Sequence, residues 1–358
     1  MKRVGILTAG GDCPGLNATI RGVAKSLYVE FGEDIEIIGF SDGYRGLIQN
    51  DCHLMKQSDF SGILTSGGTI LGTARTPYKK MQVIEDDMVD KVSAMKRTYK
   101  ERKLDCLLTL GGNGTHKTAN LLSENGLNVI GLPKTIDNDI YGTDFTFGFH
   151  TAVDIATDVI DRVHTTATSH KRVMVVEIMG NKVGWLALYA GLAGGADIIL
   201  LPEIPFEFDR VVEAVESRMK GYKPFAIIAV AEGAMDAAEA KMKRKEMLRL
   251  REERGETTIT NRLAAYIAQK GEFDTRTVVP GHILRGGSPS AYDRMLSTRF
   301  GAYAAKLVGR QEFGVTVALK NDRIVANKLS DVAGKTKKVD PDSQIVDTAR
   351  RIGISFGD

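Results

Sequence analysis

The feature that most constrains the fold is an alternation of short apolar segments with longer segments of helical periodicity. The first apolar segment, 4–8 (VGILT), is followed by a glycine-rich loop and then by apolar residues spaced as on one face of a helix. Further apolar segments occupy 35–40, 106–110, 128–132, 172–178, 197–201, 225–231 and 275–279. Continuously apolar strands that alternate with helices are typical of parallel sheets buried on both faces. The sequence therefore predicts an α/β, doubly wound protein with two such units.

One segment departs from this alternation. Residues 237–256 (AAEAKMKRKEMLRLREERGE) are dense in charge and rich in helix-forming residues. This composition predicts an exposed helical insertion.

Composition argues against several classes of protein. The net charge is only +3, so no bulk positive field favours nucleic acid or a membrane as a partner. No apolar segment approaches the roughly 20 residues of a membrane span. The three cysteines, Cys13, Cys52 and Cys106, are far apart, which fits neither a disulfide framework nor a zinc site. We therefore expect a cytoplasmic protein.

Two glycine-rich loops follow apolar segments and precede helices. The first is 10–17 (GGDCPGLN) and the second is 111–115 (GGNGT). Glycines allow the backbone to approach a phosphate, and the following helix directs its N–H groups to the same place. Each loop alone is also explained as a tight strand-to-helix turn, but two in one sheet favour a polyphosphate ligand.

Carboxylates follow the apolar segment at 128–132. Asp137 and Asp139 flank Asn138 in the sequence PKTIDND. A carboxylate at a strand end can accept a hydroxyl proton and help to hold Mg²⁺. The alternative is an Asx-turn, which Asp and Asn favour.

Basic residues also lie near predicted strand ends. Arginine binds phosphate well because its planar donors are fixed, although most single surface arginines are simply solvated. The candidates are Arg75, Arg172, Arg276, His282 and Arg285.

Taken together, these motifs resemble the phosphofructokinase family. GGDCPGLNATIRG, GGTILGTAR, GGNGT, PKTIDND, SHKRVMVVEIMG, AEG and GHILRGGSP occur in the family's order, from about residue 3 to residue 326. The resemblance implies two Rossmann-like domains with the active site in the cleft between them. It implies a larger donor-binding domain of residues 1–148 and 284–334, and a smaller sugar-phosphate-binding domain of residues 149–283 and 335–358. It also implies a homotetramer or homodimer with shared active sites.

The resemblance further implies an activity, the glycolytic transfer of the ATP γ-phosphoryl group to the 1-hydroxyl of fructose 6-phosphate. Asp137 would be the base, with Thr135 and Arg172 as its catalytic companions, and Mg²⁺ would lie at Asn113 and Asp139. The implied donor-binding residues are Gly11, Arg75, Gly112, Asn113, Gly114, Thr115 and Lys134. The implied sugar-phosphate residues are Thr135, Asp137, Arg172, Met179, Gly180, Glu232, Arg276, His282 and Arg285, of which Arg172 reaches the site from a neighbouring subunit in the family.

The phosphoryl donor has a mixed signature. The glycine at position 114 resembles the residue that ATP-dependent members of the family have there. The lysine at position 134 resembles the residue that pyrophosphate-dependent members have there. An Asp in place of Gly114 would crowd and repel the α-phosphate region, so we predict ATP as the donor, with pyrophosphate as the alternative.

Two residues differ from the family pattern. Asn113 stands where an Mg²⁺-binding Asp is usual, and Asn181 stands where an arginine is usual. A neutral ligand weakens a site for a hard cation, so a catalytically weak regulatory paralogue is a second alternative. A nicotinamide oxidoreductase is disfavoured because no GxGxxG motif is followed by an acidic residue at the required distance.

Overall fold

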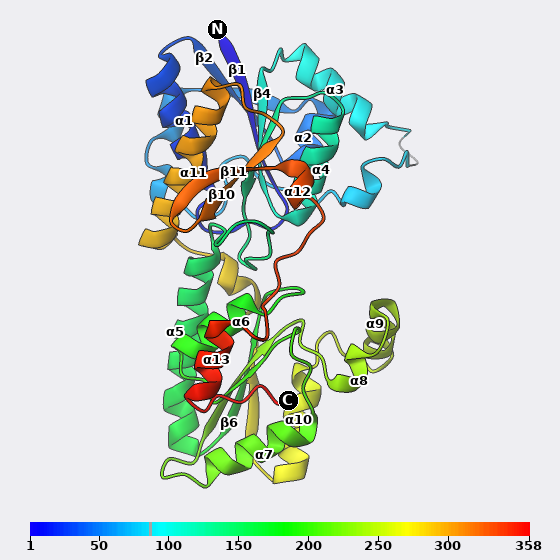
Figure 1. Cartoon of the computed structure of the whole chain (residues 1–358), viewed down its shortest axis with the longest axis vertical. Helices are drawn as coiled ribbons and strands as arrows, with labels where there is room; N and C mark the ends of the chain where they lie inside the picture. The colour runs from blue at the N-terminus through cyan, green and yellow to red at the C-terminus, as the bar shows by residue number, and fades with distance from the viewer. Residues whose placement is uncertain (86–87) are drawn as a thin grey trace. The chain divides into compact units, whose positions relative to one another are not determined.

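The computed structural model describes residues 1–85 and 88–358, and the chain forms two compact units (Figure 1). Unit 1 contains residues 1–151 and 285–337, and unit 2 contains residues 152–284 and 338–358. The boundaries expected from sequence follow residues 148, 283 and 334. Each unit has a sheet of its own, so each is described separately.

Unit 1 is built on a seven-stranded sheet in the order β11-β10-β5-β4-β1-β2-β3. The five central strands are parallel, whereas β3 and β11 pair antiparallel at the two edges. Their bounds are β1 (Lys2–Ala9), β2 (Ile35–Phe40), β3 (Cys52–Met55), β4 (Cys106–Gly111), β5 (Val129–Pro133), β10 (Val315–Lys320) and β11 (Arg323–Lys328).

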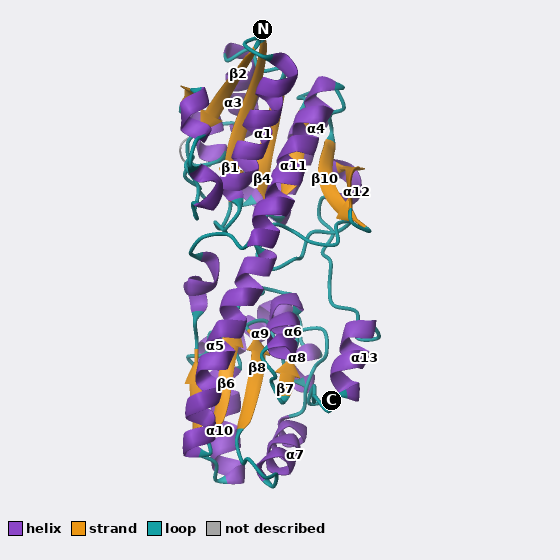
Figure 2. Cartoon of the chain, turned by 90° about the vertical axis from the view of Figure 1, so that its left-hand side faces the viewer, coloured by secondary structure: helices purple, strands orange, loops and turns teal. Residues whose placement is uncertain are grey.

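Helices cover this sheet, as Figures 1 and 2 show. A buried cluster joins Leu7, Phe40 and Leu107 of the sheet to Tyr44 and Leu122 of the covering helices. The helices of this cluster are α2 (Tyr44–Gln49), α3 (Lys91–Glu101), α4 (Asn113–Glu124) and α12 (Leu329–Val332). The other helices are α1 (Leu16–Phe31) and α11 (Ala291–Gly309), with the short 3₁₀ turns η1 (Gln57–Phe60), η2 (Ile63–Thr65) and η3 (Tyr78–Lys80).

Helices α1 and α11 approach each other closely because glycines meet at their contact. A Cβ on Gly301 would lie 2.5 Å from the Thr19 carbonyl oxygen, and one on Gly22 would lie 3.0 Å from that of Thr298. A larger residue at either position would therefore force the two helices apart.

Unit 2 contains a four-stranded parallel sheet in the order β7-β8-β6-β9. Its strands are β6 (Val173–Ile178), β7 (Ile198–Leu200), β8 (Ala226–Ala231) and β9 (Thr275–Val278). Its helices are α5 (Phe149–His170), α6 (Trp185–Ala193), α7 (Phe208–Met219), α8 (Ala237–Ala240), α9 (Arg244–Glu253), α10 (Thr260–Gly271) and α13 (Gln344–Arg351), and η4 (Gly281–Arg285) is a 3₁₀ turn at the unit boundary.

All eight predicted strands are present, and the predicted α/β, doubly wound fold is confirmed. Helices α8 and α9 lie within the predicted insertion at 237–256. Strand β3 and the β10–β11 hairpin are not among the predicted elements, and they add antiparallel edges to the otherwise parallel sheet of unit 1.

Candidate active site

In unit 1, strand register brings three predicted loops to one edge of the sheet. Ala9 at the end of β1 pairs with Gly111 at the end of β4, and Gly111 in turn pairs with Pro133 at the end of β5. The chain reverses its direction across the sheet here, because β2 lies on one side of β1 and β4 on the other. Such a switch point is where open α/β sheets bind their ligands.

The loop after β1 is fixed by its backbone conformation and hydrogen bonds. Gly10 adopts φ of 88°, a left-handed conformation that favours glycine. Its N–H donates to the Ala74 carbonyl at 3.2 Å, and its carbonyl accepts from Thr73 Oγ1 at 2.6 Å. The predicted donor residue Arg75, which follows Ala74, is exposed.

Arg285 lies against the same loop. Its Nη1 donates to the Asp12 carbonyl at 3.1 Å, and a Cβ on Gly11 would lie only 2.6 Å from that Nη1. Gly11 therefore leaves room for the guanidinium. Arg285, which is predicted among the sugar-phosphate residues, lies beside the predicted donor loop of unit 1.

Lys134 connects the end of β5 to the loop after β1. The side chain is buried, and its Nζ donates to the Gly11 carbonyl oxygen. Burial lowers the pKa of Lys134, and the nearby Arg285 acts in the same direction, while Asp137 and Asp139 act against it. One potential phosphate-binding lysine is thus already engaged with the backbone.

Helix α4 begins at the second glycine loop. Gly112 is its N-cap, and the exposed Gly114 lies in its first turn, where an added Cβ would meet no described atom within 4 Å. The first N–H groups of a helix lack intrahelical acceptors and carry positive partial charge, so this end can bind an anion. Thr115 is buried, and its hydroxyl lies 3.5 Å from the Ala9 carbonyl oxygen.

A buried histidine that no sequence motif indicates fixes this turn. The Nδ1 of His116 lies 3.0 Å from the Gly112 carbonyl, and its Nε2 lies 2.9 Å from Thr316 Oγ1 of β10. Because a carbonyl can only accept, Nδ1 carries the proton and Nε2 accepts from the hydroxyl. Burial lowers the pKa of His116 to about 4, so the ring is neutral at physiological pH.

The loop after β5 contains the predicted base. Asp137 is buried, and its N–H donates to Thr135 Oγ1 at 3.0 Å. Thr146 Oγ1 donates to the Thr135 carbonyl at 2.7 Å, and Asn138 adopts φ of 53°. These bonds hold the carboxylate-bearing turn in one conformation.

Asn113 of α4 contacts Asp139 of this loop. The Asn113 Nδ2 donates to Asp139 Oδ2 at 2.9 Å, and burial raises the pKa of the Asp139 carboxyl. Because the amide nitrogen faces the carboxylate, the Asn113 Oδ1 points elsewhere, and it is buried without a hydrogen-bond partner among the described residues.

These two residues carry oxygens of the type that magnesium prefers, although the Asn113 amide turns its nitrogen, not its oxygen, toward the Asp139 carboxylate. Mg²⁺ is usually held by one or two protein oxygens, with phosphates and water completing its shell. Asn113 offers an unpartnered oxygen and Asp139 a carboxylate, whereas the described residues contain no cluster of three or more His, Cys, Asp or Glu side chains able to hold a metal alone.

A residue that no sequence pattern indicated supports the same loop. The Lys337 Nζ donates to the carbonyls of Thr143 at 3.0 Å and Asp144 at 2.6 Å, and its backbone N–H donates to the Asp139 carbonyl at 2.9 Å. Burial lowers the pKa of Lys337 to about 8. Lys337 lies in a polar segment with no periodicity, so the sequence carries no signal for these contacts.

In unit 2, three predicted residues meet at the carboxyl ends of β6 and β8. Ile178 pairs with Ala231, so the loops that begin at Met179 and Glu232 are neighbours. The Glu232 carboxylate accepts the N–H groups of Gly180 and Asn181.

Two predicted arginines lie at the other end of the same sheet. Arg172 precedes β6, and Arg276 pairs with Met174 in β9. Both bind Asp274, at 2.6 Å and 2.5 Å respectively. The six residues of β6 separate Arg172 from Met179, a span of about 20 Å at roughly 3.3 Å per residue. One chain therefore does not bring Arg172 and Met179 to the same small ligand.

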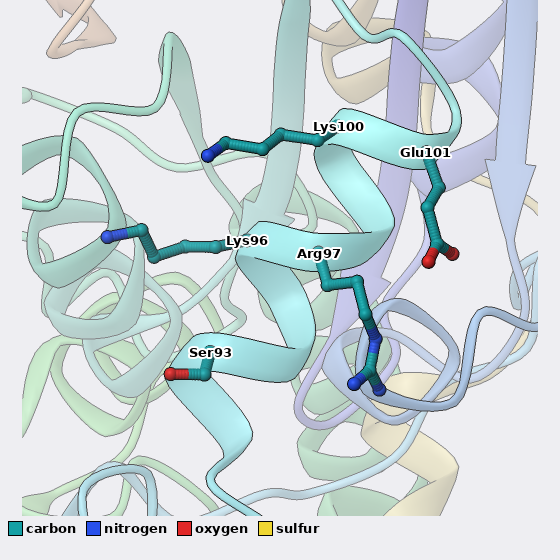
Figure 3. A pocket seen from close by; sticks show the side chains of 5 residues that line it. All are labelled: Ser93, Lys96, Arg97, Lys100 and Glu101. Atoms are coloured by element: carbon teal, nitrogen blue, oxygen red, sulfur yellow. The ribbon is translucent and has the colours of Figure 1, made fainter.

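The remaining sugar-phosphate candidate, His282, is exposed in η4, three residues before Arg285. A hollow on the surface of α3 contains none of the predicted residues (Figure 3). Lys96 and Lys100 extend from one side of α3 and Arg97 and Glu101 from another, as on a solvated helix.

With this geometry established, comparison with known proteins identifies the family. Residues 3–308 match the sequence model described as Phosphofructokinase. The chain belongs to the phosphofructokinase family. It is 54% identical to "ATP-dependent 6-phosphofructokinase" of Spirochaeta thermophila, over 100% of this chain and 98% of that protein. It is 47% identical to "ATP-dependent 6-phosphofructokinase 3" of Bacteroides thetaiotaomicron, over 99% of this chain and 100% of that protein.

A solved structure agrees with this assignment. The phosphofructokinase of Saccharomyces cerevisiae superposes with a TM-score of 0.79 at 28% identity, covering 92% of this chain and 45% of the yeast chain. Among the described residues, no helix combines the length and apolar character needed to cross a membrane.

Proposed function

We propose that this phosphofructokinase family member is an ATP-dependent 6-phosphofructokinase, which transfers the γ-phosphoryl group of ATP to the 1-hydroxyl of fructose 6-phosphate. The observation that carries this proposal is the alignment of Ala9, Gly111 and Pro133, which brings two glycine loops and Asp137 to one switch point. The full-length relatives named as ATP-dependent enzymes support it.

The donor phosphates would bind in unit 1. Phosphoryl transfer needs in-line positioning and charge neutralisation more than covalent chemistry. The N–H groups at the start of α4, the backbone at Gly11 and the Arg285 guanidinium would supply these contacts. Asn113 and Asp139 would hold Mg²⁺, which when bound neutralises negative charge on the phosphates.

Asp137 would act as the general base. Its carboxylate would accept the proton of the sugar 1-hydroxyl as that oxygen bonds to the γ-phosphorus and the bond to the bridging oxygen of ADP breaks. Thr135 would orient Asp137 through the bond between its hydroxyl and the Asp137 N–H.

Gly114 would make ATP the preferred donor. The position is exposed and open, whereas Lys134, the feature shared with pyrophosphate users, is engaged with the Gly11 carbonyl. A lysine held in this way need not exclude a nucleotide. Pyrophosphate is the second candidate because Lys134 lies at the same loop.

The sugar phosphate would bind between two copies of the chain. Met179, Gly180 and Glu232 lie at one end of β6 and Arg172 at the other, about 20 Å away, so we propose that the partner subunit's Arg172 completes each site. Mixing the inactive variants Glu232→Ala and Arg172→Ala should then restore part of the activity. If mixtures in which the two variants have exchanged subunits stay inactive, the proposal of shared sites is contradicted.

The reaction itself is tested by ³¹P NMR of fructose 6-phosphate, ATP and Mg²⁺ incubated with the protein. We expect ADP and a second sugar phosphate resonance, from the new phosphate on carbon 1, to grow together. ADP formation without a new sugar phosphate would show hydrolysis instead and would refute the proposed transfer.

A further inference from the structure

The two helices of the insertion at 237–256 are joined to each other by a buried ion pair. Arg251 of α9 is 3% exposed and Glu239 of α8 is 2% exposed. The Arg251 Nη2 lies 2.5 Å from Glu239 Oε2, and its Nε lies 3.1 Å from Glu239 Oε1. This bidentate ion pair holds α9 against α8.

A second arginine joins the pair to the body of unit 2. The Nη2 of Arg262 in α10 donates to Glu239 Oε1 at 2.7 Å and to Asp236 Oδ2 at 3.2 Å. Burial alone would raise the pKa of Glu239, but its bonds to Arg251 and Arg262 outweigh burial and lower it. Glu239 is therefore ionised at neutral pH, bound to two guanidinium groups.

Arg251 also makes a hydrogen bond outside the ion pair. Its Nη2 donates to the carbonyl of Ala234 at 2.9 Å, and Ala234 is fully buried. Ala234 belongs to residues 232–236, the segment that begins with Glu232 at the end of β8 and that we call the Glu232 loop.

The Glu232 loop is in turn packed on the loop after β6. The Glu232 carboxylate binds the N–H groups of Gly180 and Asn181, and a Cβ on Gly233 would lie 2.3 Å from the Asn181 carbonyl oxygen. A shift of the Ala234 backbone would therefore move both loops that carry the proposed sugar-phosphate residues Met179, Gly180 and Glu232.

We propose that Arg251 of the insertion is a positioning residue for the sugar-phosphate site. Its guanidinium, fixed by Glu239, holds the Ala234 carbonyl and so fixes the Glu232 loop. This inference rests on the proposed function, because that proposal is what assigns Glu232 to the sugar-phosphate site. Loss of the bond to Ala234 should weaken the binding of fructose 6-phosphate and leave ATP binding unchanged.

The test must separate positioning from stability. Removing Arg251 alone leaves part of a buried charge uncompensated, whereas replacing a whole buried ion pair by apolar residues of similar volume is often neutral. The double variant Glu239→Leu/Arg251→Met removes the pair together with the Ala234 bond, and Arg262 keeps Asp236 and Glu256 as partners. The matched control is Arg249→Met, on the same helix, whose pair with Glu253 at 3.1 Å is exposed.

We expect the double variant to raise the KM for fructose 6-phosphate about fivefold to tenfold, with kcat and the KM for ATP close to wild type. Arg249→Met should match wild type in all three constants. A double variant with an unchanged KM for the sugar phosphate, or with kcat and both KM values altered together, would overturn the inference.

Hydrogen–deuterium exchange without substrates supplies a readout that does not depend on turnover. Segments 179–184 and 232–236 should exchange faster in the double variant than in Arg249→Met, while segment 111–115 of unit 1 should not change. Unchanged exchange in both unit 2 segments would overturn the positioning role even if wild type is active. If wild type is inactive and these segments still exchange faster, the proposed function fails while the attachment through Arg251 stands.

Discussion

Replacing Gly114 by Asp should weaken ATP binding and stabilise the fold at the same time. The position is in the first turn of α4, and an added Cβ would meet no described atom within 4 Å, so the protein itself accommodates the side chain. A carboxylate at a helix N-terminus stabilises by about 0.3–1 kcal/mol. Any loss of ATP use must therefore come from the ligand and not from misfolding.

The size of that loss follows from electrostatics. Groups on one helical turn lie about 6 Å apart. Two like unit charges at this separation repel by roughly 1–3 kcal/mol for effective dielectric constants between about 80 and 20. A phosphate bound at the start of α4 should thus lose about 5-fold to 150-fold in affinity, and added salt should recover part of the loss.

The assay compares Gly114→Asp with the neutral isostere Gly114→Asn, using the KM for ATP at saturating fructose 6-phosphate and the free energy of unfolding in urea. We expect the Asp variant to show the higher KM and an equal or greater free energy of unfolding. If both variants lose ATP use equally, size and not charge is responsible. If neither does, Gly114 does not face the donor.

Three other predictions concern single residues. Asp137→Ser should lower kcat by about 10²–10⁴ with little change in the KM for fructose 6-phosphate, because a base acts mainly in the transition state, and unchanged turnover would remove Asp137 from the mechanism. Asn113→Asp would place a second carboxylate where Nδ2 now lies 2.9 Å from Asp139 Oδ2. The added charge should lower the Mg²⁺ concentration needed for half-maximal rate, and repulsion between the two carboxylates should lower the midpoint of unfolding without Mg²⁺. No shift in either quantity would place the metal elsewhere. Burial lowers the pKa of His150 to about 4, below the roughly 6.5 of an unfolded histidine, so the unfolded state gains protons first on acidification. Between pH 7 and 5, wild type should therefore lose about 1 kcal/mol more unfolding free energy than His150→Phe, which is less than full burial would give because the ring is partly exposed. Parallel curves would contradict the burial argument.

The parallel core could be predicted from sequence because each central strand is apolar along its whole length. The edge strands could not be recognised in this way, since β3 has one buried residue and β11 has none. A signal for the β10–β11 hairpin does exist in the sequence. Asn321 and Asp322 form a two-residue turn with φ of 48° and 59°, between two segments rich in β-branched residues.

The two glycine loops and the carboxylate loop of the site could be predicted because they follow strands that pair in register. Their supporting contacts could not, because they join residues far apart in the chain. His116 reaches Thr316, and Lys337 reaches Asp144, at separations that no local pattern encodes.

The most direct test of the account is a coupled assay for fructose 1,6-bisphosphate with Mg²⁺ and fructose 6-phosphate, run in parallel with ATP and with pyrophosphate. The account predicts turnover with ATP and little or none with pyrophosphate, because Gly114 leaves the donor site open and Lys134 is engaged with the Gly11 carbonyl. Turnover with pyrophosphate alone would contradict it by making Lys134 the deciding residue. No turnover with either donor would contradict the catalytic role itself and favour the regulatory paralogue to which Asn113 and Asn181 point.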